Sequence, residues 1–153
     1  EDWPVLPKLL KAGGYETAVF GKSAPMDHVS AQGKPGTLNW GNPTHFGFDA
    51  FSGQPDQGLC HNMYPATIND GTSVVNLTLN TEKEKSRELC MAEPEAYNYT
   101  TDLFADHAMA WLRGRKSKKP YFLYLSFTVP HAGGWGSAPN QPEQGNPVPV
   151  AMG

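Results

Sequence analysis

The feature of the sequence that most constrains its fold is the apolar run YFLYLSFTV at residues 121–129. Nearly every position is apolar, without the alternation of a strand that has one face in water. Such a run is typical of a strand buried on both faces, as in a parallel sheet covered by helices. The run ends at Pro130, and His131 follows at the start of a glycine-rich loop. We therefore expect a rigid strand that positions a histidine at its carboxyl end.

Two helix–strand pairs are predicted. Residues 5–13 place leucines on one face and run into a Gly-Gly pair, which indicates a short helix. Residues 15–20 are rich in strand-forming side chains and lead directly into Gly21-Lys22. A longer helical pattern begins at Thr100 and stops at a Lys-Pro pair before the apolar run. Helices alternating with strands place the chain in the α/β class.

The remaining segments are predicted to be loops and a hairpin. Glycine and proline together supply 30 of the 153 residues, well above the usual share of roughly 12%. We expect long irregular loops at 23–58 and 132–153. Residues 64–79 read as two short strands around an Asp-Gly turn, a favoured hairpin sequence. Residues 81–96 are polar and charged, and we expect an exposed excursion there.

Charge and hydropathy exclude two classes of partner. The net charge is −3 and no long basic block is present, which argues against nucleic acid as a ligand. No apolar stretch reaches the roughly 18 residues that a membrane-spanning helix needs. We therefore expect no membrane span.

Two cysteines and two sequons bear on the compartment. Cys60 and Cys90 are either two buried thiols or a disulfide that closes the segment between them. Asn76 and Asn98 each begin an Asn-x-Thr sequon, a candidate glycosylation site. An even cysteine count with two sequons favours a secreted, lumenal or lysosomal location.

Two candidate functional side chains follow predicted strands. Lys22 follows the strand at 15–20, and His131 follows the strand at 121–129. Ligands of open parallel sheets bind outside the carboxyl ends of the strands. A lysine supplies a positive charge, and a histidine can donate a proton near neutral pH. The pair suits an anionic group whose leaving group needs protonation, although a solvated lysine and a structural histidine remain the alternative.

Several stretches resemble the sulfatase family. LPKLLKAGGYETAVFGK resembles the family segment L-x-x-L-L-K-x-A-G-Y-x-T-x-x-x-G-K, and GFDAF resembles G-F-D-x-F. YTTDLFADHAMAWLRGRKSKKPYFLYLSFTVPHA is similar to the family's helix and strand that end in P-H-A. DQGLCHNMYP resembles A-H-x-Y-Y-P, found in part of the family. These matches occur in family order from Leu6 to Ala132.

The resemblance implies a fold and a chemistry. The fold would be part of an alkaline-phosphatase-like mixed sheet between helices, and the activity would be hydrolysis of sulfate esters. Lys22 would contact a sulfate oxygen or the ester oxygen. His131 would bind sulfate and help to protonate the departing alcohol. His61 is either a substrate contact, as the A-H-x-Y-Y-P stretch suggests, or an ordinary loop histidine. The family also uses a formylglycine nucleophile and a calcium or magnesium ion.

This sequence departs from the family pattern in three ways. It contains neither C-x-P-x-R nor S-x-P-x-R, the motifs from which formylglycine forms. The family often continues G-K-W-H-L-G, but Ser23, Ala24 and Pro25 follow the lysine here. Asp49, Asp56 and Asp70 are scattered and lack metal-ligand spacing. We therefore expect neither the nucleophile nor the metal site within this chain.

Residues 1–153 would then be the central segment of a longer sulfatase domain, with the remainder of that domain as its partner. Its parts would be a helix–strand unit at 4–22, a loop at 23–58, a hairpin and excursion at 59–96, a helix–strand unit at 97–131 and a loop at 132–153. By itself the segment would be inactive. Two alternatives remain: a related phosphodiesterase or phosphonate hydrolase, and a non-catalytic secreted sulfatase-like glycoprotein.

Overall fold

The computed structural model describes residues 4–23, 42–55, 59–81 and 87–130. The strands are β1 (Glu16–Lys22), β2 (Ala50–Gln54), β3 (Thr67–Asp70), β4 (Ser73–Asn76) and β5 (Tyr121–Ser126). The helices are α1 (Leu6–Ala12), α2 (Thr78–Thr81), α3 (Arg87–Ala92) and α4 (Thr100–Gly114), with short 3-10 turns at Pro43–Phe46, Leu59–His61 and Pro94–Ala96. Among the described residues, none of the helices has the length and apolar character that crossing a membrane requires.

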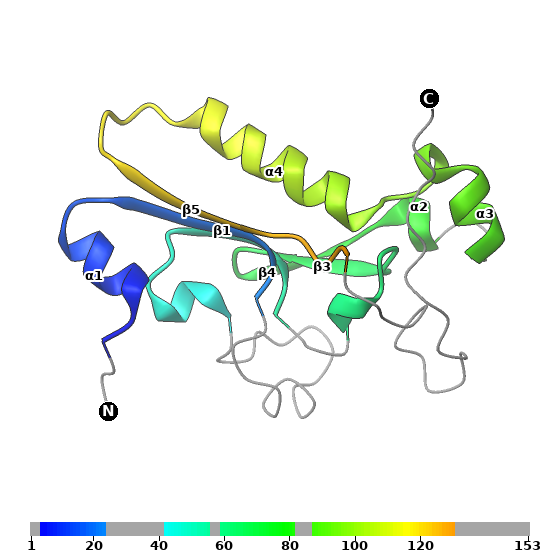
Figure 1. Ribbon diagram of the computed structural model, residues 1–153, viewed down its shortest axis with the longest axis horizontal. Coiled ribbons are helices and arrows are strands. Elements are labelled where there is room, and N and C mark those ends of the chain that lie inside the picture. Colours follow the sequence, from blue (N-terminus) through cyan, green and yellow to red (C-terminus); the bar gives the residue numbers. More distant parts are fainter. Residues whose placement is uncertain (1–3, 24–41, 56–58, 82–86, 131–153) are drawn as a thin grey trace.

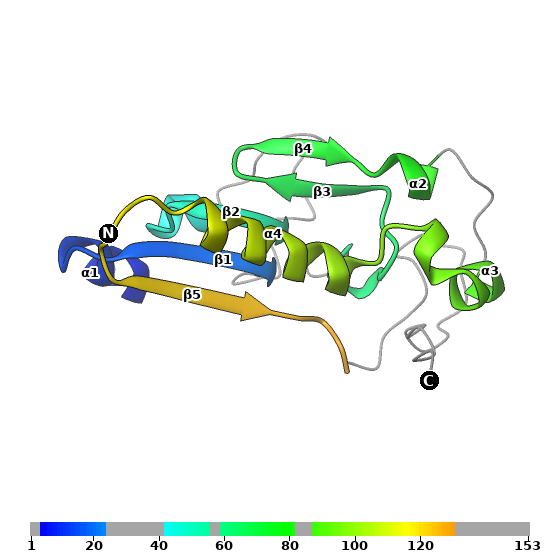
Figure 2. The ribbon, with the colours of Figure 1, turned by 90° about the horizontal axis from the view of Figure 1, so that it is seen from above.

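The described strands form one mixed sheet in the order β4-β3-β2-β1-β5. β1 lies between β2 and β5 and is parallel to both. β3 is antiparallel to both β2 and β4, and β3 and β4 form the hairpin predicted around the Asp-Gly turn. Figure 2 shows β5 beside β1 at one side of the sheet and β4 at the other. The predicted α/β class with a mixed sheet is therefore confirmed.

Helices lie on both faces of the parallel part of the sheet. Figure 1 shows α4 on one side of β1 and β5, and α1 on the other. Phe104 and Ala108 of α4 pack against Ala18 and Phe20 of β1, and all four side chains are buried. Burial of such apolar area is the main term that stabilises this layer.

A second cluster lies away from the parallel strands. It consists of five buried side chains: Met63, Tyr64, Cys90, Tyr97 and Tyr99. The Tyr64 hydroxyl donates a hydrogen bond to the backbone oxygen of Cys90 at 3.2 Å, and burial raises the pKa of Tyr64. The expectation that 81–96 is an exposed excursion was therefore incomplete, because α3 inserts Cys90 into this core.

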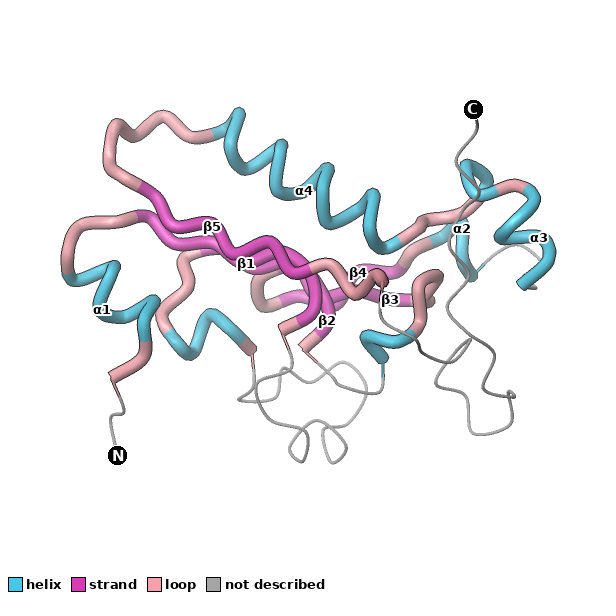
Figure 3. The backbone as a smooth tube through the Cα atoms, in the orientation of Figure 1, coloured by secondary structure: helices cyan, strands magenta, loops and turns pink. Residues whose placement is uncertain are grey.

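The apolar run differs most from its prediction. β5 covers residues 121–126 rather than 121–129, and in the described sheet it pairs only with β1. Tyr124 is 49% exposed and Leu125 is 38% exposed. The prediction of a strand buried on both faces is thus wrong for the described residues. The reason is positional, because β5 is at the edge of the described sheet and α4 packs mainly on the neighbouring strand β1. The smooth tube of Figure 3 shows β5 running alongside β1.

Candidate functional site

The candidate site lies where the parallel strands β1, β2 and β5 end together. In the register of the sheet, Lys22 is the partner of Gln54, and Gly21 is the partner of both Gly53 and Ser126. Three parallel strands thus present their last residues at one edge. This is the position at which α/β sheets bind ligands.

Gly21 explains how this edge is assembled. Its φ is +115°, a conformation that side-chain-bearing residues rarely adopt. A Cβ atom at this position would lie 1.9 Å from the backbone oxygen of Ser126. A Cβ at Gly53 would in turn lie 2.0 Å from the backbone oxygen of Gly21. Glycine at both positions lets the strands approach closely just before Lys22.

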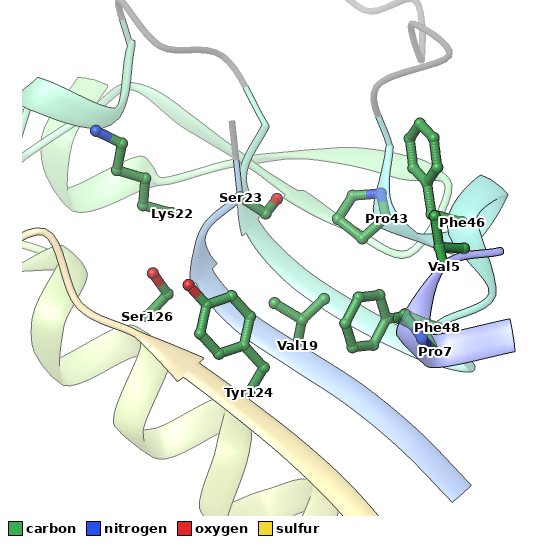
Figure 4. Close-up of a pocket in the computed structure, with 10 residues that line it drawn as sticks. All are labelled: Val5, Pro7, Val19, Lys22, Ser23, Pro43, Phe46, Phe48, Tyr124 and Ser126. Carbon is green, nitrogen blue, oxygen red and sulfur yellow. The ribbon is translucent and has the colours of Figure 1, made fainter. Parts of the chain in front are cut away.

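A cavity of about 530 Å³ lies beside this edge, on the face that carries α1. Most of its lining is apolar: Val5, Pro7, Val19, Pro43, Phe46 and Phe48. Lys22, Ser23, Tyr124 and Ser126 also line it. Figure 4 shows these polar side chains grouped near the ends of β1 and β5, with the phenylalanines farther along the cavity. The cavity therefore has a polar end at the carboxyl edge of the sheet.

Lys22 is the single charged residue of the described lining. It is partly buried, and no carboxylate of the described residues forms an ion pair with it. An ammonium group without an acidic partner at the polar end of a cavity attracts an anion. The structure thus places Lys22 at the end of β1, and its catalytic role remains a prediction.

The other predicted catalytic residue, His131, lies outside the described residues. β5 ends at Ser126, and the described chain continues to Pro130, the residue before the histidine. The joint position of Lys22 and His131 therefore remains a prediction.

His61 occupies the 3-10 turn Leu59–His61 and is partly buried. It is absent from the described lining of the cavity beside Lys22. Its role as a substrate contact remains a prediction.

The two sequons differ in their surroundings. Asn76 is exposed on the edge strand β4. Asn98 is partly buried, and its backbone exchanges hydrogen bonds of 2.8 and 2.9 Å with the Asn80 side chain. In the second sequon, the Thr100 hydroxyl is buried and donates to the Met63 sulfur at 3.5 Å. Asn76 is therefore the more accessible of the two side chains in the folded chain.

Both cysteines are buried. Cys60 is in the 3-10 turn Leu59–His61, and Cys90 is in α3 within the second core. Their pairing in a disulfide remains a prediction.

The Gly-Phe-Asp motif serves the sheet rather than the chemistry. Asp49 accepts hydrogen bonds from the backbone nitrogen and the hydroxyl of Thr17, at 3.0 and 3.1 Å, and pairs with Lys11. Burial raises the pKa of Asp49, but the hydrogen bonds from Lys11 and Thr17 outweigh it and hold this pKa below its usual value. Asp49 thereby joins the start of β1 to the turn before β2.

A serine–histidine pair lies on the opposite face of the sheet. The Ser52 Oγ lies 2.6 Å from His107 Nδ1 of α4. Ser52 is buried, and its hydroxyl is already engaged by His107. The pair therefore anchors α4 to β2.

Two polar groups at the carboxyl edge were missed by sequence reasoning. Ser23 Oγ and both amide atoms of the Gln54 side chain are buried and have no hydrogen-bond partner among the described residues. The prediction of an irregular loop over 23–58 was wrong for residues 50–54, which form β2. Gln54 became informative only once β2 was known to pair with β1.

Metal ligands are not brought together in the described part of the chain. No cluster of three or more His, Cys, Asp or Glu side chains there could hold a metal ion. The described residues therefore do not fit the metal that the resemblance implies.

Comparison with known proteins yields a family and a partial structural match. The family model described as Sulfatase matches residues 2–149. A solved structure described as BT4656 in complex with its substrate, D-glucosamine-2-N,6-O-disulfate, is 26% identical to this chain. The match covers 85% of this chain with a TM-score of 0.47. It covers 19% of the other protein, so the chain spans about one fifth of that protein's length.

Proposed function

The chain belongs to the sulfatase family, and on this premise we propose that it forms the central part of a domain that hydrolyses sulfate esters. In this proposal Lys22 contacts an oxygen of the sulfate group or the ester oxygen. His131 binds sulfate and helps to protonate the departing alcohol. The formylglycine nucleophile and the metal ion typical of the family would be supplied by other parts of the protein.

The observation that carries the proposal is the position of Lys22. It is the last residue of β1, at the carboxyl edge of three parallel strands and at the polar end of a cavity. Its ammonium group has no acidic partner among the described residues. A fixed positive charge at this place stabilises the negative charge that develops on sulfate and ester oxygens as the S–O bond breaks.

The histidine supplies the complementary step. An alcohol leaves poorly as an alkoxide, and a general acid that protonates its oxygen accelerates the cleavage. Histidine suits this role because its usual pKa lies near neutral pH. Support for the assignment comes from the family motif P-H-A and from the position of His131 shortly after β5.

Three further proposals concern the protein's surroundings. His61 would contact the substrate, in keeping with its family motif. The protein would be secreted, lumenal or lysosomal, with carbohydrate on Asn76 and Asn98. The accessible side chain of Asn76 supports its modification more directly than the partly buried Asn98 does.

The test is hydrolysis by the intact protein that carries this chain, with para-nitrophenyl sulfate and a para-nitrophenyl phosphodiester as probes. We expect the sulfate ester to be the better substrate. Lys22→Ala should lower kcat/KM by about 100-fold, a typical loss for a group that stabilises developing charge. Lys116→Ala is the matched control, because Lys116 is an exposed lysine outside the described lining of the cavity.

Two results would contradict the proposal. Preferential hydrolysis of the phosphodiester would identify a related phosphodiesterase or phosphonate hydrolase. Binding of a sulfated glycan without hydrolysis of any ester would identify a non-catalytic relative.

A further inference from the structure

Gln54 is the last residue of β2 and is unusually placed for a polar side chain. It is only 3% exposed, yet neither its amide nitrogen nor its amide oxygen has a hydrogen-bond partner among the described residues. Buried polar groups in proteins are nearly always hydrogen-bonded. Leaving one unsatisfied costs about 1–3 kcal/mol. The Gln54 carboxamide therefore requires a partner that the described residues do not provide.

Ser23 is in the same situation and is directly linked to Gln54. The backbone nitrogen of Ser23 donates to the backbone oxygen of Gln54 at 3.1 Å. The Ser23 hydroxyl is buried and has no partner in the described part of the chain. The preceding residue, Lys22, is the register partner of Gln54. Three side chains that can donate hydrogen bonds are thus adjacent at one strand end.

The three residues lie at the adjoining ends of β1 and β2, and Gln54 is not part of the described cavity lining. Ser23 lines the cavity on the α1 face, and Figure 4 shows it beside Lys22 at the strand end. Gln54 is two residues after Ser52, which contacts α4, so by strand alternation it belongs to the opposite face. A ligand just beyond the strand ends can be reached from both sides of the sheet.

The chemistry of the three donors selects an anion. An ammonium group, a carboxamide N–H and a hydroxyl can all donate to the same cluster of oxygens. The described lining of the cavity contains no carboxylate that would compete for Lys22. A tetrahedral oxyanion offers several acceptor oxygens in different directions, which matches donors that approach from two faces.

We propose that Gln54 Nε2 and Ser23 Oγ, together with Lys22, bind the oxygens of the substrate's sulfate group. This inference rests on the proposed function and adds two contacts to it. Gln54 supplies a neutral, buried donor, whose hydrogen bond to an anion is stronger than one between neutral groups. Ser23 supplies a second donor from the cavity side.

The test measures the affinity of the intact protein for inorganic sulfate by calorimetry, at constant ionic strength. Gln54→Leu removes the amide at similar volume, and we expect it to raise Kd by about 10-fold or more, as for a lost hydrogen bond to a charged group. Gln54→Glu should weaken binding further, because it places a negative charge beside the anion. Ser23→Ala, a smaller change, should also raise Kd.

The matched control for charge is Ser73→Asp, because Asn76 on the same strand is a proposed glycosylation site. It makes the same neutral-to-acidic change on the exposed strand β4, two strands away from β2. We expect its sulfate affinity to equal that of the unmodified protein. Thermal midpoints of all variants, measured in parallel, report any structural effect.

The outcomes separate this inference from the proposed function. If Lys22→Ala weakens sulfate binding but Gln54→Leu and Ser23→Ala change only the thermal midpoint, the two side chains are structural. This inference then fails and the proposed function stands. If the intact protein neither binds sulfate nor hydrolyses sulfate esters, both fail.

Discussion

At the scale of single residues, the conformation of Gly21 determines whether the candidate site can form. The residue combines a positive φ with a close approach to the Ser126 backbone, and Lys22 follows immediately. The two residues therefore act together. Gly21 allows β1 to approach the backbone of β5 closely, and Lys22 follows as the last residue of β1.

Replacement of Gly21 by alanine should be severely destabilising. The new Cβ would clash with backbone rather than with a flexible side chain, and the positive φ adds strain. We expect a loss of more than about 2 kcal/mol in the free energy of unfolding, measured by urea denaturation of the intact protein. Gly114→Ala is the control, since nothing lies within 4 Å of a Cβ at the end of α4. Equal stability of the two variants would contradict the strained geometry.

Asp49 should make stability depend on pH. Its pKa is held below the usual 3.8, so its carboxylate stabilises the fold above that pH. This contribution is lost as the pH falls through the lowered pKa. Asp49→Asn should therefore cost about 0.5–1.5 kcal/mol at neutral pH and progressively less in acid. Unfolding curves at several pH values test this, with the exposed Asp106→Asn as the control for the loss of one charge. If Asp49→Asn lowered the free energy of unfolding by the same amount at every pH, the lowered pKa of Asp49 would not stabilise the fold as described.

At the scale of elements, α4 is the main cover of one face of the sheet. Its buried residues Phe104 and Ala108 recur at helical spacing and pack on β1. Ser52 and His107 add a hydrogen bond between the helix and β2. The strands that carry the candidate site are thus supported from this side by one helix.

Phe104→Ala should remove much of that support. A buried phenylalanine typically contributes about 3–5 kcal/mol relative to alanine, because truncation loses apolar burial and leaves a cavity. Met109→Ala, on the same helix but 43% exposed, should cost far less. Denaturant midpoints of the two variants provide the measurement. A similar midpoint for both would show that α4 is not packed as described.

At the scale of the whole molecule, the described sheet ends in a strand with one open edge. β5 has one neighbour within the described sheet, and Tyr121, Tyr124, Leu125 and Phe127 are exposed. Exposed apolar edge strands promote association with other chains.

The purified 153-residue chain should therefore be marginally stable or prone to aggregation, and it should not hydrolyse sulfate esters. Its sequence lacks the motif that yields formylglycine. Size-exclusion chromatography, thermal unfolding and a para-nitrophenyl sulfate assay provide the tests. A monodisperse monomer with a sharp, reversible transition would contradict the first expectation. Turnover that is abolished by His131→Ala would contradict the second.

Local sequence patterns determined most of the elements in this protein. The leucine spacing of α1, the Asp-Gly turn between β3 and β4, and the helical period of α4 depend on neighbours within a few residues. These elements depend on local backbone preferences and on a single buried face, so they can be predicted from the sequence before the tertiary structure is known. The placement of Lys22 at a strand end was predictable for the same reason.

Only the tertiary structure decided the strand order and the groups that meet at the carboxyl edge. The apolar run of β5 predicted burial on both faces, but exposure depends on which strands lie beside it. Gln54 and Ser23 are 31 positions apart in the sequence and meet because β1 and β2 pair in parallel. Their unsatisfied hydrogen-bonding groups arise from burial, and burial is a property of the packed chain that no local pattern contains.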